Sequence, residues 1–153
     1  MKYYYTYSTI LGDIEIAEED GYITKLYIRD NIEDDYIKKE TELIYEAFKQ
    51  LDEYLKGERR EFELPLKAEG TQFQMSVWDA LTKIPYGETR SYKDIAVAIN
   101  NEKAVRAVGN ANNKNPISIF IPCHRVIGTN GKLVGYGGGL DIKEKLLNIE
   151  KSK

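Results

Sequence analysis

"SYKDIAVAINNEKAVRAVGNAN", residues 91–112, holds two short helix-forming runs separated by a pair of asparagines. Ser91 is placed to cap the first run, and Val105 and Val108 recur on one side of the second. The asparagines, residues 100–101, favour a tight turn between the runs. This pattern predicts a helix-turn-helix, although it is also typical of an ordinary helical core.

The second of these runs carries mostly small side chains. Ala104, Ala107 and Gly109 leave its backbone almost bare, with Arg106 as the long cation among them. A helix that reads the major groove presents several long side chains to base edges. The small residues instead favour close approach to a narrow minor groove, where one arginine can enter the base stack. Close packing against another element of the same protein is the alternative.

The residues before this stretch also form a helical pattern. Thr71 is placed to cap a helix over residues 72–84, whose apolar side chains recur at helical spacing. "PYGE", residues 85–88, ends that helix. The side chains expected to face inward are Phe73, Val77, Trp78 and Leu81.

The first part of the chain predicts a small sheet and one helix. Residues 2–8, 13–17 and 22–28 are rich in β-forming residues and follow one another closely, as in an antiparallel meander. Residues 39–55 place apolar side chains on one helical stripe, and Gly57 ends the helix. We therefore expect an α/β N-terminal domain with a linker, residues 1–68, and a mainly α C-terminal domain, residues 69–153.

The two parts of the chain differ in charge. Residues 71–153 hold 12 basic and 7 acidic residues, whereas residues 1–70 hold 10 and 18. A basic part joined to an acidic one favours contact of the basic part with a polyanion such as DNA. Chance segregation of solvated charges explains the difference equally well. The sequence shows no apolar run of membrane-spanning length and no signal peptide, so we expect a cytoplasmic protein.

"IPCHRVIG", residues 121–128, contains the only cysteine, Cys123, and the only histidine, His124. Neither a disulfide nor a zinc site can be built from one of each. A cysteine in an apolar stretch is usually a packed core residue. A nucleophilic cysteine needs a base such as imidazole, itself oriented by a third group. In extended backbone the two neighbours point to opposite faces, so a water or a bend would have to connect them.

Four motifs together resemble the O6-alkylguanine-DNA alkyltransferase family, also called methylated-DNA–protein-cysteine methyltransferases. They occur in the family's order across residues 71–150, and the resemblance implies a ribonuclease-H-like N-terminal domain and a winged helix-turn-helix C-terminal domain. The motifs are "FQMSVWDALTKIPYGETRSYKDIA", "AVRAVGNANNKNP", "IPCHRVIG" and "GYGGGLDIKEKLLNIE".

The resemblance implies a role for each of several residues. Cys123 is the nucleophile and alkyl acceptor, and His124 deprotonates it through a water. Glu150 is the acidic partner of His124. Tyr92 turns the nucleotide out and donates a proton to the guanine, and Asn115 holds the turn before the active site. Read without the resemblance, Tyr92 is an aromatic core residue and Glu150 a solvated helix end.

Further residues are implied in binding. Arg106 replaces the extruded base in the stack, and the DNA-contacting surface also includes Ser91, Tyr92, Ala104, Ala107 and Gly109. The pocket for the base is formed by Val126, Tyr136, Gly137, Ser118 and Trp78. Ser118 and Gly137 depart from the proline and serine of some family members, which changes the expected width of the pocket.

The implied function is repair of DNA by direct damage reversal. A single-turnover suicide reaction transfers the alkyl group from O6-alkylguanine, and also from O4-alkylthymine, in duplex DNA to Cys123. No cofactor, metal or membrane is expected, and the protein is expected to be a monomer. Two alternatives are a winged-helix regulator with an inert cysteine and a damage sensor that binds alkylated DNA without accepting the group; the retained cysteine favours the transferase.

Overall fold

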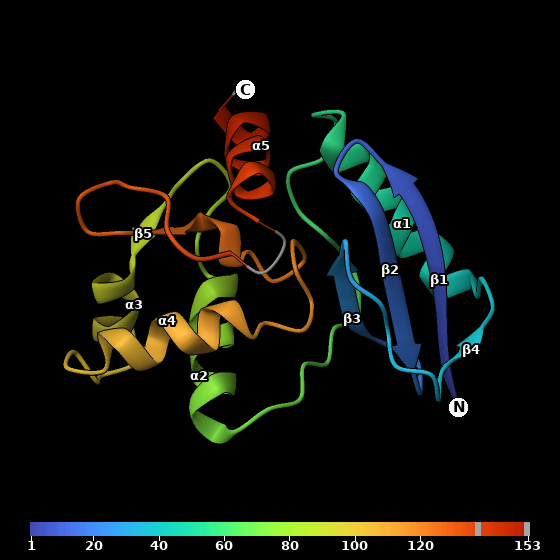
Figure 1. Cartoon of the computed structure of the whole chain (residues 1–153), viewed down its shortest axis with the longest axis horizontal. Helices are drawn as coiled ribbons and strands as arrows, with labels where there is room; N and C mark the ends of the chain where they lie inside the picture. Colours follow the sequence, from blue (N-terminus) through green and yellow to red (C-terminus); the bar gives the residue numbers. More distant parts are fainter. Residues whose placement is uncertain (137–138, 152–153) are drawn as a thin grey trace. The chain divides into compact units, whose positions relative to one another are not determined.

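The computed structural model describes residues 1–136 and 139–151, which divide into two compact units (Figure 1). The first unit comprises Met1–Ala68 and Pro116–Phe120, and the second comprises Glu69–Asn115 and the chain from Ile121 onward. The chain thus returns to the first unit after the second has begun. The expected division after residue 68 assigns this returning segment, Pro116–Phe120, to the C-terminal domain. In the part of the chain that the structure describes, no helix has the length and apolarity needed to cross a membrane.

The first unit is built on a sheet with the strand order β3-β2-β1-β4. Strands β1 (Lys2–Thr9), β2 (Gly12–Glu19) and β3 (Tyr22–Ile28) form the antiparallel meander predicted from the sequence. The fourth strand, β4 (Ile37–Lys38), pairs parallel to β1 and was not predicted. Two residues are too short a run to show a period-2 pattern.

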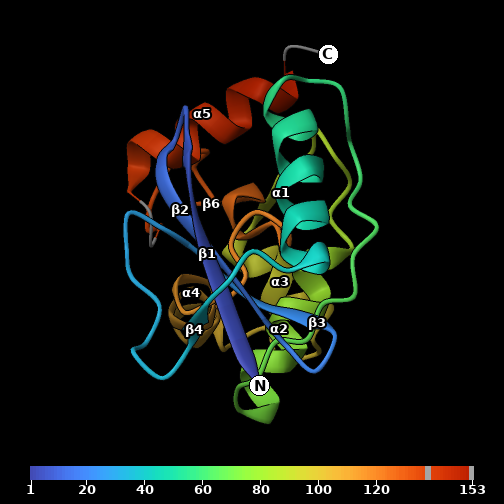
Figure 2. The same cartoon turned by 90° about the vertical axis from the view of Figure 1, so that its right-hand side faces the viewer.

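Helix α1 (Glu42–Leu55) packs against this sheet (Figure 2). It begins at Glu42 and not at residue 39, because the Thr41 side chain accepts a hydrogen bond from the Ile44 N–H at 3.1 Å and caps the helix. Gly57, with φ at 77°, follows the helix end in the left-handed region that glycine adopts without strain. The buried apolar residues of the strands and the helix are Ile14, Ile16, Ala17, Ile23, Leu26, Ile28, Ile44, Ala47, Leu51 and Tyr54.

The segment 116–120 lies beside β3 in the first unit. The Leu26 N–H donates to the Pro116 carbonyl at 2.9 Å, and the Ser118 N–H donates to the Leu26 carbonyl at 3.3 Å. Ile117 is fully buried there. Ser118, which the resemblance assigns to the base pocket, is therefore part of the sheet edge of the first unit.

The second unit contains the predicted helix-turn-helix. Helices α2 (Gln72–Thr82) and α3 (Tyr92–Ala98) begin at the expected residues, and each has a capping box: Thr71 pairs with Gln74, and Ser91 pairs with Asp94. The following helix, α4 (Val105–Asn113), begins three residues later than the pattern predicts. The Ala104 N–H donates to the Asn101 carbonyl at 2.9 Å, so residues 102–104 complete the turn between the helices.

The remaining elements connect the helix pair to the cysteine. A 3₁₀ turn, η1 (Cys123–Arg125), leads directly into β6 (Val126–Ile127), which pairs parallel to β5 (Arg90–Ser91) just before α3. Helix α5 (Leu140–Lys151) packs against η1. The backbone at Cys123 is therefore bent, and the extended conformation considered for the sequence is not found.

The cap of α2 contributes to the stability of the second unit. We expect Thr71→Ala to lower the free energy of unfolding by about 1 kcal/mol, because the Gln74 N–H in the first turn loses the Thr71 hydroxyl as its partner. Thr82→Ala is the matched control, since the Thr82 hydroxyl only donates to the Asp79 carbonyl within the same helix. Urea unfolding measures both variants. Equal stability losses in the two variants would contradict the assigned cap.

Candidate active site

Cys123 lies in the bend of η1, where two asparagines hold the backbone. Asn115 donates from Nδ2 to the Ile121 carbonyl at 2.8 Å, and Asn112, at the end of α4, donates from Nδ2 to the Cys123 carbonyl at 3.4 Å. Cys123 is only 3% exposed. The thiol is thus buried, and its backbone is tied to the helix expected to meet DNA.

The environment of Cys123 keeps its proton on the sulfur. Burial raises the pKa of the thiol, while a hydrogen bond from Asn115, the charge of Lys143 and the hydroxyl of Tyr136 act in the opposite direction. Burial is the dominant effect, so the resting group is a thiol near neutral pH. A base is therefore needed before Cys123 can act as a nucleophile.

His124 is fully buried and is bonded to the carboxylate of Glu150. The distance from Nε2 to Oε2 is 2.8 Å. Burial lowers the pKa of His124 below its usual range, and Glu150 only partly opposes this effect. The imidazole is consequently neutral near pH 7, with Nε2–H donating to Glu150 and Nδ1 in the acceptor form.

Glu150 lies on α5 and is almost completely buried, with donors around both oxygens. Arg125 donates from Nε to Oε1 at 2.9 Å and from Nη2 to Oε2 at 3.0 Å, and the Gly87 N–H donates to Oε1 at 3.0 Å. Arg125 also donates from Nη1 to the Ile84 carbonyl at 2.7 Å. Glu150 is therefore a fixed, multiply bonded carboxylate, and the alternative of a solvated helix end is wrong.

A buried lysine, Lys143, lies on the same face of α5 as Glu150, about two turns away. Its ammonium donates to the Val134 carbonyl at 2.9 Å and to the Gly135 carbonyl at 3.4 Å, and burial lowers its pKa to about 8. The Tyr92 hydroxyl donates to the same Val134 carbonyl at 2.8 Å. Burial raises the pKa of Tyr92, so that hydroxyl keeps its proton at neutral pH.

Arg125 and Lys143 were not predicted from the sequence to belong to the site. Arg125 directly follows the cysteine and histidine, but its partner is on α5, far along the chain. Lys143 could have been noticed, because it falls on the apolar stripe of α5 at helical spacing from Leu146 and Glu150, where a solvated cation is not expected.

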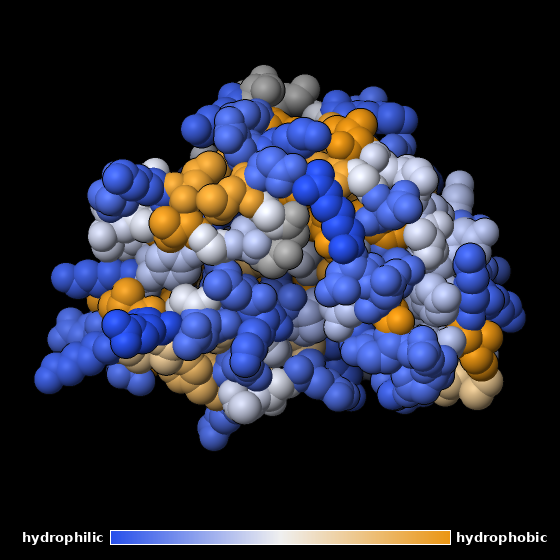
Figure 3. Space-filling model, viewed as in Figure 1, coloured by the Kyte–Doolittle hydropathy of each residue, from blue (hydrophilic) through white to orange (hydrophobic). Residues whose placement is uncertain are grey.

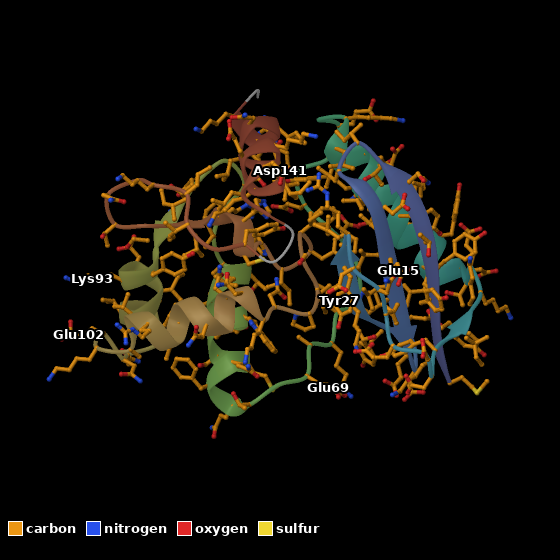
Figure 4. The ribbon with its side chains drawn as sticks, in the orientation of Figure 1. Glu15, Tyr27, Glu69, Lys93, Glu102 and Asp141 are labelled. Atoms are coloured by element: carbon orange, nitrogen blue, oxygen red, sulfur yellow. The ribbon has the colours of Figure 1, made fainter. Side chains whose placement is uncertain are left out.

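Several residues assigned to DNA contact lie together at the start of α3 and along α4. Arg106 and Ala107 are exposed, Ala104 and Ser91 are half-buried, and Lys93 and Glu102 mark the outer end of the helix pair (Figure 4). A Cβ added at Gly109 would lie 3.9 Å from the Tyr92 ring, an ordinary contact distance. Packing against Tyr92 therefore does not require a glycine here.

The residues assigned to the base pocket occupy different positions. Trp78 is buried and donates from Nε1 to the Ala111 carbonyl at 2.9 Å, so it joins α2 to α4. Val126 is buried in β6, and Tyr136 is half-buried near the thiol. Gly137 lies outside the described residues. Figure 3 shows a hydrophobic patch over part of the segment between β6 and α5, where Val134 is 43% exposed.

The comparisons with known proteins cover both units. Residues 2–68 match the family model "6-O-methylguanine DNA methyltransferase, ribonuclease-like domain", and residues 72–152 match "6-O-methylguanine DNA methyltransferase, DNA binding domain". The chain is 52% identical to the constitutive methylated-DNA–protein-cysteine methyltransferase of Bacillus subtilis, over 99% of this chain and 96% of the relative. It is also 52% identical to the methylated-DNA–protein-cysteine methyltransferase of Methanosarcina acetivorans, over 98% and 99% of the two chains.

Solved structures agree in fold. The crystal structure of Mycobacterium tuberculosis OGT in complex with DNA has a TM-score of 0.93 at 44% identity, covering 98% of this chain and 93% of that one. The crystal structure of the M. tuberculosis O6-methylguanine methyltransferase has a TM-score of 0.91 at 44% identity, over 99% and 94%. The expected α/β domain followed by a helical DNA-binding domain is confirmed, and with both family models matched, this chain belongs to the 6-O-methylguanine DNA methyltransferase family.

Proposed function

We propose that this protein repairs DNA by transferring an alkyl group from O6 of guanine to the sulfur of Cys123. The observation that carries the proposal is the buried thiol beside a buried His124–Glu150 pair, with 2.8 Å between Nε2 and Oε2. Family membership and relatives named as methylated-DNA–protein-cysteine methyltransferases support it. The protein is an enzyme only in the single-turnover sense, because the cysteine is consumed.

The reaction is a displacement at the alkyl carbon. The bond from Cys123 Sγ to carbon forms while the bond from carbon to guanine O6 breaks. The thiol proton passes through a water to His124, and guanine leaves as a neutral base with a proton from Tyr92. One proton leaves the thiol and one enters guanine, and the balance is closed when His124 releases the thiol proton to solvent and Tyr92 takes up one from solvent. The pKa directions fit these roles, since Cys123 begins as a thiol and His124 as a neutral base.

The burial of Cys123 means that the damaged base has to leave the duplex. A thiol that is 3% exposed cannot reach O6 of a stacked and paired guanine. Tyr92 and Arg106 are the residues we assign to rotation of the nucleotide and to filling of the space it leaves. Before Tyr92 can donate its proton to the guanine, its hydroxyl has to break the hydrogen bond to the Val134 carbonyl. The 128–136 segment is thereby linked to base entry.

Binding of DNA follows from the family and its helix-turn-helix domain. As finer statements we propose that the substrate is duplex DNA carrying O6-alkylguanine or O4-alkylthymine, that the protein acts as a monomer, and that it works in the cytoplasm. The exposed Arg106 among small residues of α4 supports a minor-groove contact. Such binding is not sequence-specific, because phosphate and minor-groove contacts position the protein while the pocket selects the base.

The function is tested by weighing the intact protein after incubation with duplex DNA that contains O6-methylguanine. We expect a gain of one methyl group, located on the peptide that contains Cys123, and no gain with unmodified duplex. Cys123→Ser should not gain the methyl group but should bind DNA within a few-fold of wild type, because the thiol is buried away from the exposed face of α4. A wild-type protein that binds the modified duplex and keeps its mass would be a damage sensor.

Arg106 provides a test of base extrusion. We expect Arg106→Ala to slow transfer from duplex DNA more than transfer from the free base O6-benzylguanine, because a free base needs no unstacking. Lys103→Ala is the matched control, an exposed cation just before the same helix that we do not assign to the base stack. Single-turnover rates on both substrates give the comparison. Equal losses on both substrates in Arg106→Ala would remove the role in extrusion.

Lys143 should give the protein a pH-dependent stability. Burial lowers its pKa from 10.5 in the unfolded chain to about 8, so between these values the unfolded chain binds a proton that the folded protein has released. The contribution of Lys143 to the free energy of unfolding therefore becomes more favourable as pH rises through this window. Below pH 8 the buried lysine is charged, and its full destabilising effect is present.

Comparison with Lys143→Met isolates this effect. We expect the stability of wild type relative to Lys143→Met to increase steadily from pH 8 to pH 10 in urea unfolding. Lys145→Met, which changes an exposed lysine of the same helix, should show no such trend. Parallel stability curves for wild type and Lys143→Met would mean that Lys143 is not a buried ammonium.

A further inference from the structure

The carboxylate of Glu150 is bonded to the side chains of both His124 and Arg125. His124 Nε2 contacts Oε2 at 2.8 Å, and Arg125 contacts Oε1 and Oε2 from Nε and Nη2 at 2.9 and 3.0 Å. The side chains of Glu150 and His124 are 1% and 0% exposed, and that of Arg125 is 8% exposed. Water therefore contributes little to neutralising this carboxylate, and the arginine is its permanent counter-ion.

We propose that Arg125 is a positioning residue that keeps the His124–Glu150 pair one proton short at neutral pH, so that the pair can accept the proton of Cys123. The proposal rests on the transfer reaction proposed above and assigns its proton balance to a third side chain. Arg125 itself contacts neither the substrate nor the thiol in this account. It acts through Glu150, whose position and ionisation it determines.

The charge of the site differs with and without the arginine. With Arg125 present, the resting set of Arg125, Glu150, His124 and Cys123 contains one cation, one anion, a neutral imidazole and a neutral thiol, so its net charge is zero. After the proton moves from Cys123 to His124, the same four side chains hold two cations and two anions, and their net charge is still zero. The Lys143 ammonium, bonded to the Val134 and Gly135 carbonyls, is present in both states and does not change this comparison. Neither state leaves an uncompensated charge among the four side chains, which would be strongly unfavourable away from water.

Without Arg125 the same pair would be a buried anion with a vacant proton site. Such a group binds a proton from solvent, either on the imidazole, because the charge of Glu150 is then opposed by no bound cation and favours a charged ring, or on the carboxylate, because burial disfavours its charge. In both cases the pair already holds the proton that it has to receive from Cys123. The base would then form only at higher pH, after that extra proton had been released.

The other titratable groups near His124 do not replace Arg125. Lys143, also on α5, donates its ammonium protons to the Val134 and Gly135 carbonyls, and Cys123 is the proton donor itself. Tyr92 of α3 donates to the Val134 carbonyl. On the turn before β5, Tyr86 presents its ring to Arg125 at 5.7 Å, and Gly87 contributes only a backbone N–H to Glu150. Arg125 is the cation bonded to the carboxylate.

The first measurement uses the wild-type protein. His124 is the only histidine in the chain, so the imidazole signals in ¹⁵N and ¹H NMR spectra belong to it without further assignment. We expect a neutral ring with the proton on Nε2 at pH 7, and protonation of the ring only at a pH below its usual range, because burial lowers the pKa of His124. An imidazolium at pH 7 in the wild type would overturn the proposal, whatever the variants do.

The second measurement compares variants at position 125 by NMR and by single-turnover methyl transfer. In Arg125→Gln, which keeps polar groups but removes the charge, we expect the acid limb of the rate profile to move to higher pH by about one unit or more. At a pH on that limb this corresponds to about a tenfold loss of rate. The ring signals of His124 should show an inflection at the same pH. Arg125→Lys, which restores the charge without the bidentate geometry, should return the limb close to its wild-type position.

Arg59→Gln is the matched control, because Arg59 is bonded to Glu53 in the first unit at 2.8 Å and should leave the profile unchanged. A uniform loss of rate in Arg125→Gln, with the acid limb and the ring signals as in wild type, would reduce Arg125 to a structural role. If Arg125→Gln does not fold, Arg125→Lys and the wild-type spectrum still decide, since a displaced limb in Arg125→Lys contradicts the proposal. Methyl transfer by the wild type is scored separately, so the proposed function can stand when this inference fails.

Discussion

The buried carboxylate of Glu150 is the contact on which the second unit depends. This carboxylate accepts hydrogen bonds from His124 and Arg125 of η1 and from the Gly87 N–H in the turn before β5. One side chain of α5 therefore joins segments that are far apart in the chain. A carboxylate removed from water is tolerated only when such donors are all in place. The same requirement that stabilises this part of the fold therefore also sets the orientation of His124, the proposed base, next to Cys123.

A second set of contacts joins the reactive turn to the helix expected to meet DNA. Asn112 at the end of α4 bonds to the Cys123 carbonyl, and Asn115 bonds to the Ile121 carbonyl. Trp78 supports the same helix from α2 through the Ala111 carbonyl. A thiol that reacts once needs no route for its own regeneration, so its surroundings can be closely packed and hydrogen-bonded. In the proposed reaction, entry of the base then depends on the segment that Tyr92 and Lys143 hold at the Val134 carbonyl.

Local sequence patterns predicted most of the regular elements correctly. The three long strands, the caps at Thr71 and Ser91 and the helix pair follow from short stretches of sequence, and the structure contains them. The observed elements differ from the predicted ones where a local pattern competes with a hydrogen bond to a residue outside that pattern. Residues 102–104 form a turn because the Ala104 N–H finds the Asn101 carbonyl, and β4 exists because its two residues pair with β1. The segment 116–120 likewise belongs to the first unit because its partner is Leu26.

The sequence alone determined the class of the fold and the candidate nucleophile, because the only cysteine and the only histidine stand side by side in one of four ordered motifs that resemble a known family. Only the tertiary structure decided that Glu150 is buried and that Arg125 is bonded to its carboxylate. It also decided that Lys143 is fully buried and donates to the Val134 carbonyl. The physical reason is that ionisation depends on burial and on partners brought together from distant positions. His124 and Arg125 meet Glu150 across 26 and 25 residues of chain, and no periodic pattern carries information over such a separation.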